Sequence, residues 1–148
     1  MSGMAAIAAD TAEGHEVTGR AKPVTSLRTW LFSGGWPPED GWPARNIHTD
    51  LEFARSSGLP ARNAAGAMME GYVAELMIDM FGPGWLSAGS YSVKFIRTVD
   101  IGDHVTSRAR ITARRPEAGG TAFEAELWCE NQHGDKVVVG SGTGRVEG

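Results

Sequence analysis

The longest hydrophobic pattern in the chain has the period of a helix. In residues 66–81, GAMMEGYVAELMIDMF, apolar side chains recur at steps of three and four residues, which places them on one face of a helix. This face is wide enough to predict a largely buried helix, and Gly82-Pro83-Gly84 predicts its sharp end. The apolar positions are Met69, Tyr72, Val73, Leu76, Met77, Met80 and Phe81, with Met68 and Ile78 beside them.

Beyond residue 89 the pattern changes to an alternation of apolar and polar residues. A period of two with one polar face predicts antiparallel strands with one face exposed to solvent. Glycine lies in each segment between these strands and predicts a turn there. The predicted strands are residues 90–95, 105–113, 123–130 and 137–146, and the turns are residues 100–103, 117–120 and 132–135.

A curved sheet with one apolar face needs a second layer to cover that face, and the buried helix can supply it. We therefore predict an α+β hot-dog fold, in which an antiparallel sheet wraps around one long central helix. Residues 21–148 are predicted to form this single domain. The sequence has no internal repeat, and 148 residues are too few for two such domains.

Weaker signals precede the long helix. Residues 1–20 are rich in alanine, glycine and acidic groups and predict a loosely ordered arm, with a short strand around Glu16–Gly19. Thr25 is a predicted N-cap for a helix over residues 26–32. The apolar stripe of this helix would consist of Leu27, Trp30 and Leu31.

A loop and a second short helix follow. Residues 33–47 contain three prolines and three glycines, which exclude regular structure. Two tryptophans in this loop predict that it packs on its own domain or on a partner subunit. Thr49 or Asp50 can then cap a short helix over residues 51–55.

Composition narrows the classes of function. Apolar residues make up 41% and charged residues 22% of the chain, which is typical of a globular protein. A net charge of -4 argues against a nucleic acid or an anionic membrane as the partner. Residues 1–9 lack the basic region of a signal peptide, and no apolar run approaches the ~20 residues of a membrane helix. The single cysteine, Cys129, excludes an intrachain disulfide, and we expect a cytoplasmic protein.

Three segments together resemble the MaoC-like, R-specific enoyl-thioester hydratase family. Residues 46–55, NIHTDLEFAR, followed by Ser57-Gly58-Leu59-Pro60, are similar to the family signature, roughly S-G-D-x-N-P-x-H-x-D, then an aromatic residue, alanine and glycine. Gly66 matches the glycine at the start of the family's long helix. Residues 93–103, VKFIRTVDIGD, are similar to its "kF…V…GD" strand and turn. The resemblance covers roughly residues 24–146.

The resemblance implies a hot-dog domain that reversibly adds water to a 2-enoyl thioester of coenzyme A or acyl carrier protein. His48 and an aspartate would hold the water, and the backbone N–H of Gly66 would polarise the thioester carbonyl. A helix start offers free N–H groups and a favourable dipole to a developing enolate, and glycine allows close approach. Histidine, with a reference pKa of about 6.5, suits proton transfer near neutral pH.

The sequence departs from the signature at the catalytic aspartate, where it has Pro43, and at the motif asparagine, where it has Arg45. Asp40 or Glu39 in the longer loop could supply the carboxylate. Asn46 could position the water while His48 alone acts as the base. A partner subunit could supply the missing group, or the hydratase activity could be lost.

Bland interpretations compete with several of these roles. Asp50 is better explained as a helix cap than as a catalytic carboxylate. The methionines of residues 66–81 are typical of a core that also lines an acyl pocket. The remaining histidines are not spaced as metal ligands, and no cofactor is predicted. These histidines are His15, His104 and His133.

Three functions follow from these observations. The first is a hydratase or dehydratase acting on an acyl thioester. The second is a non-catalytic or partner-dependent acyl-binding subunit, which the missing aspartate suggests. The third is a thioesterase, which would need a carboxylate such as Glu70 at the thioester carbon. An unpaired edge strand favours edge-to-edge pairing, so we expect a homodimer or a larger homo-oligomer.

Overall fold

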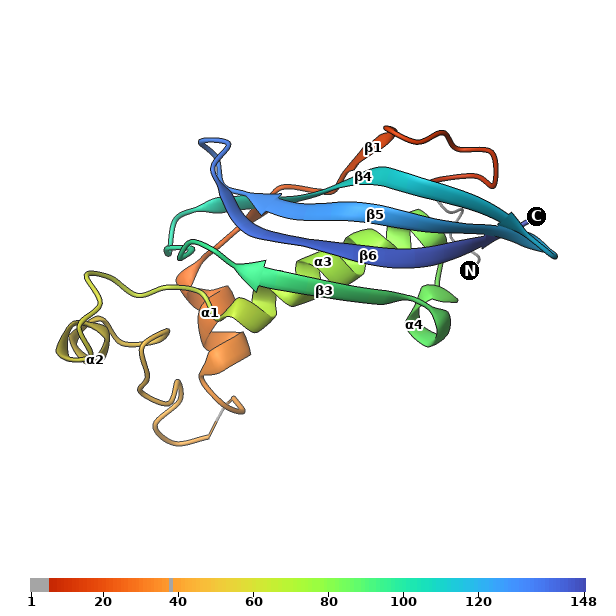
Figure 1. Ribbon diagram of the computed structural model, residues 1–148. Coiled ribbons are helices and arrows are strands. Elements are labelled where there is room, and N and C mark those ends of the chain that lie inside the picture. The colour runs from red at the N-terminus through yellow and green to blue at the C-terminus, as the bar shows by residue number, and fades with distance from the viewer. Residues whose placement is uncertain (1–5, 38) are drawn as a thin grey trace.

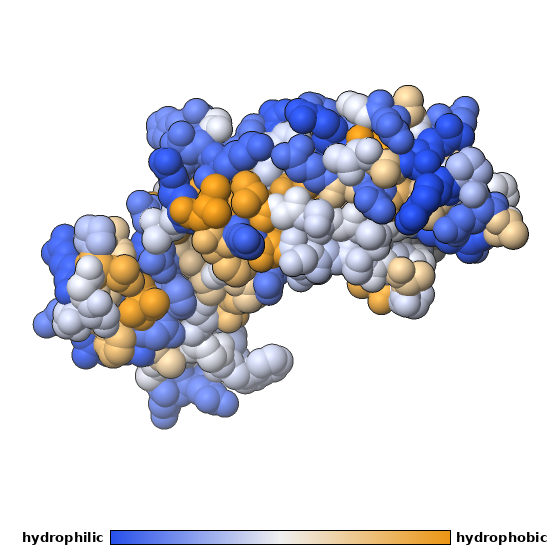
Figure 2. Space-filling model, viewed as in Figure 1, coloured by the Kyte–Doolittle hydropathy of each residue, from blue (hydrophilic) through white to orange (hydrophobic). Residues whose placement is uncertain are grey.

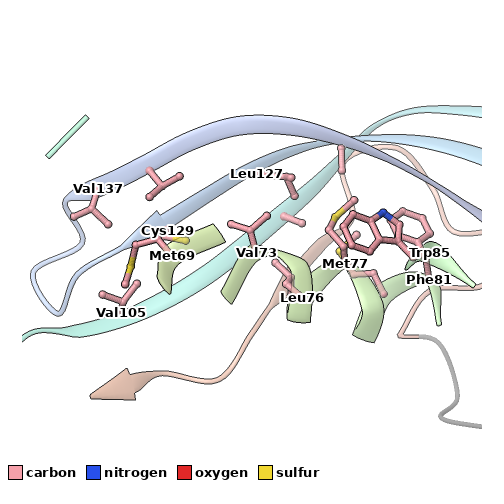
Figure 3. Packing of buried hydrophobic residues seen from close by; sticks show 14 of the residues in the cluster. Met69, Val73, Leu76, Met77, Phe81, Trp85, Val105, Leu127, Cys129 and Val137 are labelled. Carbon is pink, nitrogen blue, oxygen red and sulfur yellow. The ribbon is translucent and has the colours of Figure 1, made fainter. Parts of the chain in front are cut away.

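The long helix forms where the hydrophobic repeat predicts it. In the computed structural model, which describes residues 6–37 and 39–148, helix α3 spans Gly66–Phe81. It ends at Gly82, whose φ of 82° lies in the left-handed region that glycine adopts without strain. Figure 3 shows its side chains pointing into the centre of the core. The buried ones are Met68, Met69, Val73, Leu76, Met77, Met80 and Phe81.

One antiparallel sheet curls over this helix (Figure 1). Its strands lie in the order β1-β4-β5-β6-β3, and β2 also pairs with β4. The predicted hot-dog arrangement is thus confirmed: a sheet wrapped around one central helix, with its long strands where the alternation predicts them. The strands are β1 (Glu16–Thr18), β2 (Lys22–Pro23), β3 (Ser90–Phe95), β4 (His104–Glu117), β5 (Gly120–Glu130) and β6 (Lys136–Glu147).

Glycines in β6 let the sheet lie close to the helix. A Cβ added to Gly142 would come within 2.7 Å of the Met77 side chain, and one added to Gly144 would come within 2.4 Å of the Phe81 ring. Any larger residue at these positions would push α3 away from the sheet. The glycine-rich end of the last strand is therefore explained by packing.

The outer face of the sheet is less polar than the alternation predicts. Trp128 alternates with inward-facing residues, yet it is buried. The cationic groups of Arg110 and Lys136 lie over its ring at 5.6 and 4.8 Å from the centroid, and its indole N–H donates to Glu130. Long charged side chains can cover an aromatic ring while their heads stay in water.

The described part of the predicted N-terminal arm is attached to the domain. The strand predicted around residues 16–19 is β1, which pairs with β4. Ile7 is buried in the core, and the Ala6 N–H donates to the Asp79 carbonyl at the end of α3. Residues 1–5, which belong to the same predicted arm, lie outside the described residues.

Three short helices surround the start of α3 or follow its end. Helix α1 (Ser26–Ser33) is capped by Thr25, whose hydroxyl accepts from the Arg28 N–H as predicted. Its predicted apolar stripe is not buried: Leu27 and Leu31 are more than half exposed, and the buried residue is Thr29. The other two are α2 (Leu51–Ser56) and α4 (Trp85–Ala88), of which the sequence predicted only α2.

The exposed leucines of α1 show that the helical period does not by itself select the buried face. The Thr29 hydroxyl donates to the Thr25 carbonyl within the same helix, so its polar group is satisfied when this face packs inward. None of the helices in the described part of the chain has the length and apolar character needed to cross a membrane.

Replacing Gly144 by alanine is expected to destabilise the protein by about 1–3 kcal/mol, because the new methyl group overlaps the Phe81 ring. Urea unfolding followed by circular dichroism measures the change. The matched control is Gly84→Ala: Gly84 has φ −61° and open space around its Cβ position, so stability should change by less than about 0.5 kcal/mol. Equal stability of both variants would contradict the close packing of β6 on α3.

Candidate active site

His48 lies in a tight turn whose shape is fixed by its neighbours. The Asn46 side-chain oxygen accepts from the His48 N–H at 2.9 Å, and the Asn46 N–H donates to the Thr49 hydroxyl at 3.0 Å. The same hydroxyl donates to the Ala44 carbonyl at 2.6 Å. These hydrogen bonds fix the backbone conformation of the turn and therefore the direction in which the His48 side chain points.

The His48 ring is held by a second segment of the chain. Its Nδ1 lies 2.8 Å from the backbone oxygen of Asn63 and 3.1 Å from the Asn63 side-chain oxygen. A carbonyl oxygen only accepts hydrogen bonds, so this contact is a hydrogen bond when Nδ1 carries the proton. Nε2 is then the nitrogen that can take a proton from a reactant.

His48 and the start of α3 line the same cavity. The cavity has a volume of about 430 Å³. Figure 2 shows apolar surface gathered over the end of β3, where Phe95 and Ile96 are about half exposed. The lining is mostly apolar with a few polar groups, which is typical of a small-molecule site. It consists of His48, Asn63, Ala64, Gly66, Met69, Phe95, Ile96, Arg97, Thr98, Val99 and Val138.

Gly66 is the first residue of α3, and no side chain caps this helix start. The first N–H groups of a helix have no acceptor within the helix and carry the positive end of its dipole. The Phe95 ring lies so close that a Cβ on Gly66 would come within 3.0 Å of it. The absence of a side chain at Gly66 thus lets the Phe95 ring pack directly against the start of the helix, where both border the cavity.

The loop that replaces the signature aspartate folds on itself. Trp42 packs edge-on against Trp30 at 6.1 Å and donates to the Gly35 carbonyl, and a Cβ on Gly34 would come within 2.6 Å of Pro43. Pro43 is therefore a packing residue. Pro38, one of the prolines of this loop, lies outside the described residues.

The structure brings two of the four predicted site residues together. His48 and Gly66 share the cavity. Asn46 supports the His48 turn, and its amide donates to the Ser33 carbonyl at 2.7 Å. Asp40 and Glu39 line a separate small hollow within the loop. Among the described residues, those that line the His48 cavity include no aspartate or glutamate, and Glu70 does not line it either.

The sequence did not single out three polar residues of the cavity. Arg97 and Thr98 lie in the segment that resembles the family's strand and turn, so the resemblance located them without assigning them a role. Asn63 lies between the signature and the long helix, in a segment without periodicity, and no sequence signal marked it.

Asp50 is a helix cap, as the sequence favours. Its carboxylate accepts from the Phe53 N–H at 2.7 Å at the start of α2 and pairs with Arg45 at 3.1 Å. The hydrogen bond from Phe53 and the neighbouring Arg45 guanidinium lower the pKa of Asp50. Arg45, which stands where the signature has asparagine, therefore forms an ion pair with the residue that caps α2.

The fold and the cavity agree with a comparison of the sequence with family models. Residues 44–140, well over half of the chain, match the model of the MaoC like domain. The chain belongs to the MaoC-like domain family. The matched region of this MaoC-like domain includes both His48 and Gly66. No curated protein matches the chain in sequence.

Solved structures share the fold of this MaoC-like domain. The unliganded R-hydratase PhaJ1 from Pseudomonas aeruginosa is 18% identical, with a TM-score of 0.72 over 94% of this chain and 83% of that one. The (R)-hydratase from A. caviae involved in PHA biosynthesis is 19% identical, with a TM-score of 0.69 over 94% of this chain and 98% of that one. The C-terminally truncated HadBC (3R-hydroxyacyl-ACP dehydratase) complex from Mycobacterium tuberculosis is 15% identical, with a TM-score of 0.62 over 90% of this chain and 96% of that one. At sequence identities this low, the structural likeness shows a shared hot-dog fold and nothing further.

Asp50→Asn is expected to lower the stability of this MaoC-like domain at neutral pH. A carboxyl whose pKa is lowered by folding stabilises the folded state at every pH above the pKa that it has in the unfolded chain, about 3.9. This contribution is lost as the pH falls through the lower, folded value, so wild type and variant should converge in acid. Urea unfolding at several pH values tests the convergence. Glu52→Gln, at an exposed neighbour that also contacts Arg45, is the control.

Proposed function

We propose that this protein is a hydratase or dehydratase that adds water to a 2-enoyl thioester or removes it from a 3-hydroxyacyl thioester. The observation that carries the proposal is the single cavity that holds both the oriented His48 imidazole and the uncapped start of α3 at Gly66. Membership of the MaoC-like family and the likeness to structures named R-hydratase and 3R-hydroxyacyl-ACP dehydratase support the same chemistry.

In the forward reaction the oxygen of a water molecule bonds to C3 of the substrate. One water proton goes to Nε2 of His48, and the protonated His48 then gives a proton to C2, which completes the addition and returns the ring to its neutral form. The intermediate carries negative charge on the thioester oxygen, and the N–H of Gly66 would donate to that oxygen. A pre-placed donor at a helix start stabilises this charge without reorganisation.

The substrate is proposed to be an acyl thioester of coenzyme A or acyl carrier protein. Apolar side chains of the cavity, among them Met69 and Phe95, suit an acyl chain. Arg97 also lines the cavity and is paired with Asp135 at 3.2 Å on the surface. A guanidinium at this place could bind a phosphate of either carrier.

The second proton-transferring group is the open part of the chemistry. The contacts favour His48 as the acid–base residue, with Asn46 holding the turn that carries it. Asp40 or Glu39 as the second group is kept as an alternative, since it requires the loop to move from its own hollow to the cavity. A group from a partner subunit is the other alternative.

A partner-dependent acyl-binding subunit is the second candidate function. Pro43 at the aspartate position favours it, and a structural neighbour is described as a complex, HadBC. The thioesterase candidate lacks support from the cavity, because Glu70, the carboxylate that it needs, does not line it.

We also propose a homodimer, which is expected to sediment at twice the chain mass. Among the described strands β3 pairs only on its β6 side, and its open edge runs beside exposed Phe95 and Ile96. Pairing of two such edges would satisfy both and cover apolar surface. Ile96→Glu should shift the mass toward that of a monomer. Leu86→Glu, at an exposed leucine of α4, should leave it unchanged, and a monomeric wild type would refute the dimer.

His48→Ala is expected to lower turnover of an enoyl-CoA by about 10²–10⁴-fold, because the variant lacks the group that accepts the water proton. The assay follows loss of the enoyl absorbance with crotonyl-CoA and with a longer enoyl-CoA. His104→Ala, at an exposed histidine on β4, is the matched control and should keep wild-type turnover.

Asp40→Ala and Glu39→Ala in the same assay separate the alternatives. Wild-type turnover in both would exclude the loop carboxylates, whereas loss in either would assign the second group to the loop. A folded protein that turns over no enoyl thioester would refute the hydratase proposal for a single kind of subunit and favour the partner-dependent one.

A further inference from the structure

The residue that holds the His48 imidazole comes from outside the signature segment. Asn63 is fifteen residues further along the chain and presents two oxygens to Nδ1 of His48, its backbone carbonyl at 2.8 Å and its side-chain oxygen at 3.1 Å. Both the ring and the asparagine are partly buried at the edge of the cavity. The amide must point its oxygen at the ring, because its NH₂ group would oppose the Nδ1 proton.

The backbone around Asn63 is itself fixed, so these oxygens are held in place. Asn63 forms an isolated antiparallel bridge with Asp100, and the next residue, Ala64, donates its N–H to the Val99 carbonyl at 2.8 Å. On the other side, the Arg62 guanidinium donates to the Ser26 hydroxyl at 2.9 Å and lies 3.4 Å from the Thr49 carbonyl in the His48 turn.

Asn63 is also only three residues before Gly66. One short segment therefore sets the position of the imidazole and of the first N–H groups of α3. Two groups that must act on the same substrate are tied to one rigid piece of backbone, which is what catalytic preorganisation requires.

Two acceptors on one ring nitrogen have a chemical consequence. A neutral imidazole carries one proton, and the oxygens of Asn63 draw it to Nδ1. Nε2 then keeps its lone pair and can accept a proton from water. With the proton on Nε2 the neutral ring could not act as a base toward the cavity, so the hydrogen-bond partner of one nitrogen decides the use of the other.

We propose that Asn63 is a positioning residue for His48: its two oxygens hold the neutral imidazole in the Nδ1–H form and fix the ring plane, which leaves Nε2 as the base. The catalytic part of this inference rests on the hydratase proposed above, whereas the position of the proton on the ring does not. Pro43 has removed the signature carboxylate, and Asn63 supplies part of the order around His48.

The first test is the protonation state of the ring in the free protein. In ¹⁵N NMR spectra of the wild type at a pH where His48 is neutral, Nδ1 should have the shift of a protonated nitrogen and Nε2 that of an unprotonated one. Asn63→Leu keeps the volume and the backbone carbonyl and removes only the side-chain oxygen, so it should raise the fraction of rings protonated on Nε2 without abolishing the Nδ1–H form. An unprotonated Nδ1 in the wild type would overturn the inference whether or not the protein is an enzyme.

The second test is kinetic. Asn63→Leu should lower kcat by about 10- to 100-fold, the range known for removing the hydrogen-bond partner of a metal-bound histidine, with KM little changed. Asn63→Asp keeps the acceptor and should recover most of kcat at high pH. A carboxylate beside the ring stabilises imidazolium, so the acid limb of the kcat/KM profile should move to higher pH.

Asn131→Leu is the matched control. Asn131 also uses its side-chain oxygen to hold a turn, accepting from the N–H groups of His133 and Asp135, but it lies between β5 and β6. Its loss should lower stability without changing kcat or the His48 ¹⁵N shifts. Wild-type kcat in Asn63→Leu would overturn the positioning role, and a wild type without turnover, but with Nδ1 protonated, would refute the hydratase alone.

Discussion

The packing of α3 against β6 determines where the candidate active site can form. The helix lies so close to the sheet that a side chain on Gly142 or Gly144 of β6 would overlap Met77 or Phe81. With the helix axis fixed, the start of α3 at Gly66 has one position relative to the end of β3. The cavity forms at this junction, and its apolar wall comes from both elements. The core and the site thus depend on the same close contact.

The His48 turn is held by contacts with the segments beside the start of α3 and the end of β3. Its ring reaches Asn63, whose backbone is bridged to Asp100 in the segment after β3. Within the turn, short side chains satisfy the backbone groups that a helix or a strand would otherwise pair. This local order explains how the histidine keeps its place although the signature aspartate is absent.

The loop before His48 has a clear structural role. Pro43 packs against Gly34, and Trp42 packs against Trp30 of α1. Two carboxylates of this loop face their own hollow. Together with the exposed leucines of α1 and the open edge of β3, the loop leaves considerable apolar surface on a single chain. Such surface is typical of proteins that bind a copy of themselves or a related subunit.

The sequence alone determined the elements whose signals are local. The bounds of α3, the long strands, the Thr25 and Asp50 caps and the glycine turns follow from period and capping chemistry, because neighbouring residues decide them. The resemblance to the family also located His48 and Gly66, although it could not show that they share a cavity. Only the tertiary structure decided which face of α1 is buried, that Asp40 lies apart from His48, and that Asn63 holds the imidazole. Contacts between residues distant in the chain leave no periodic pattern in the sequence, and the packing of the whole domain is what sets them.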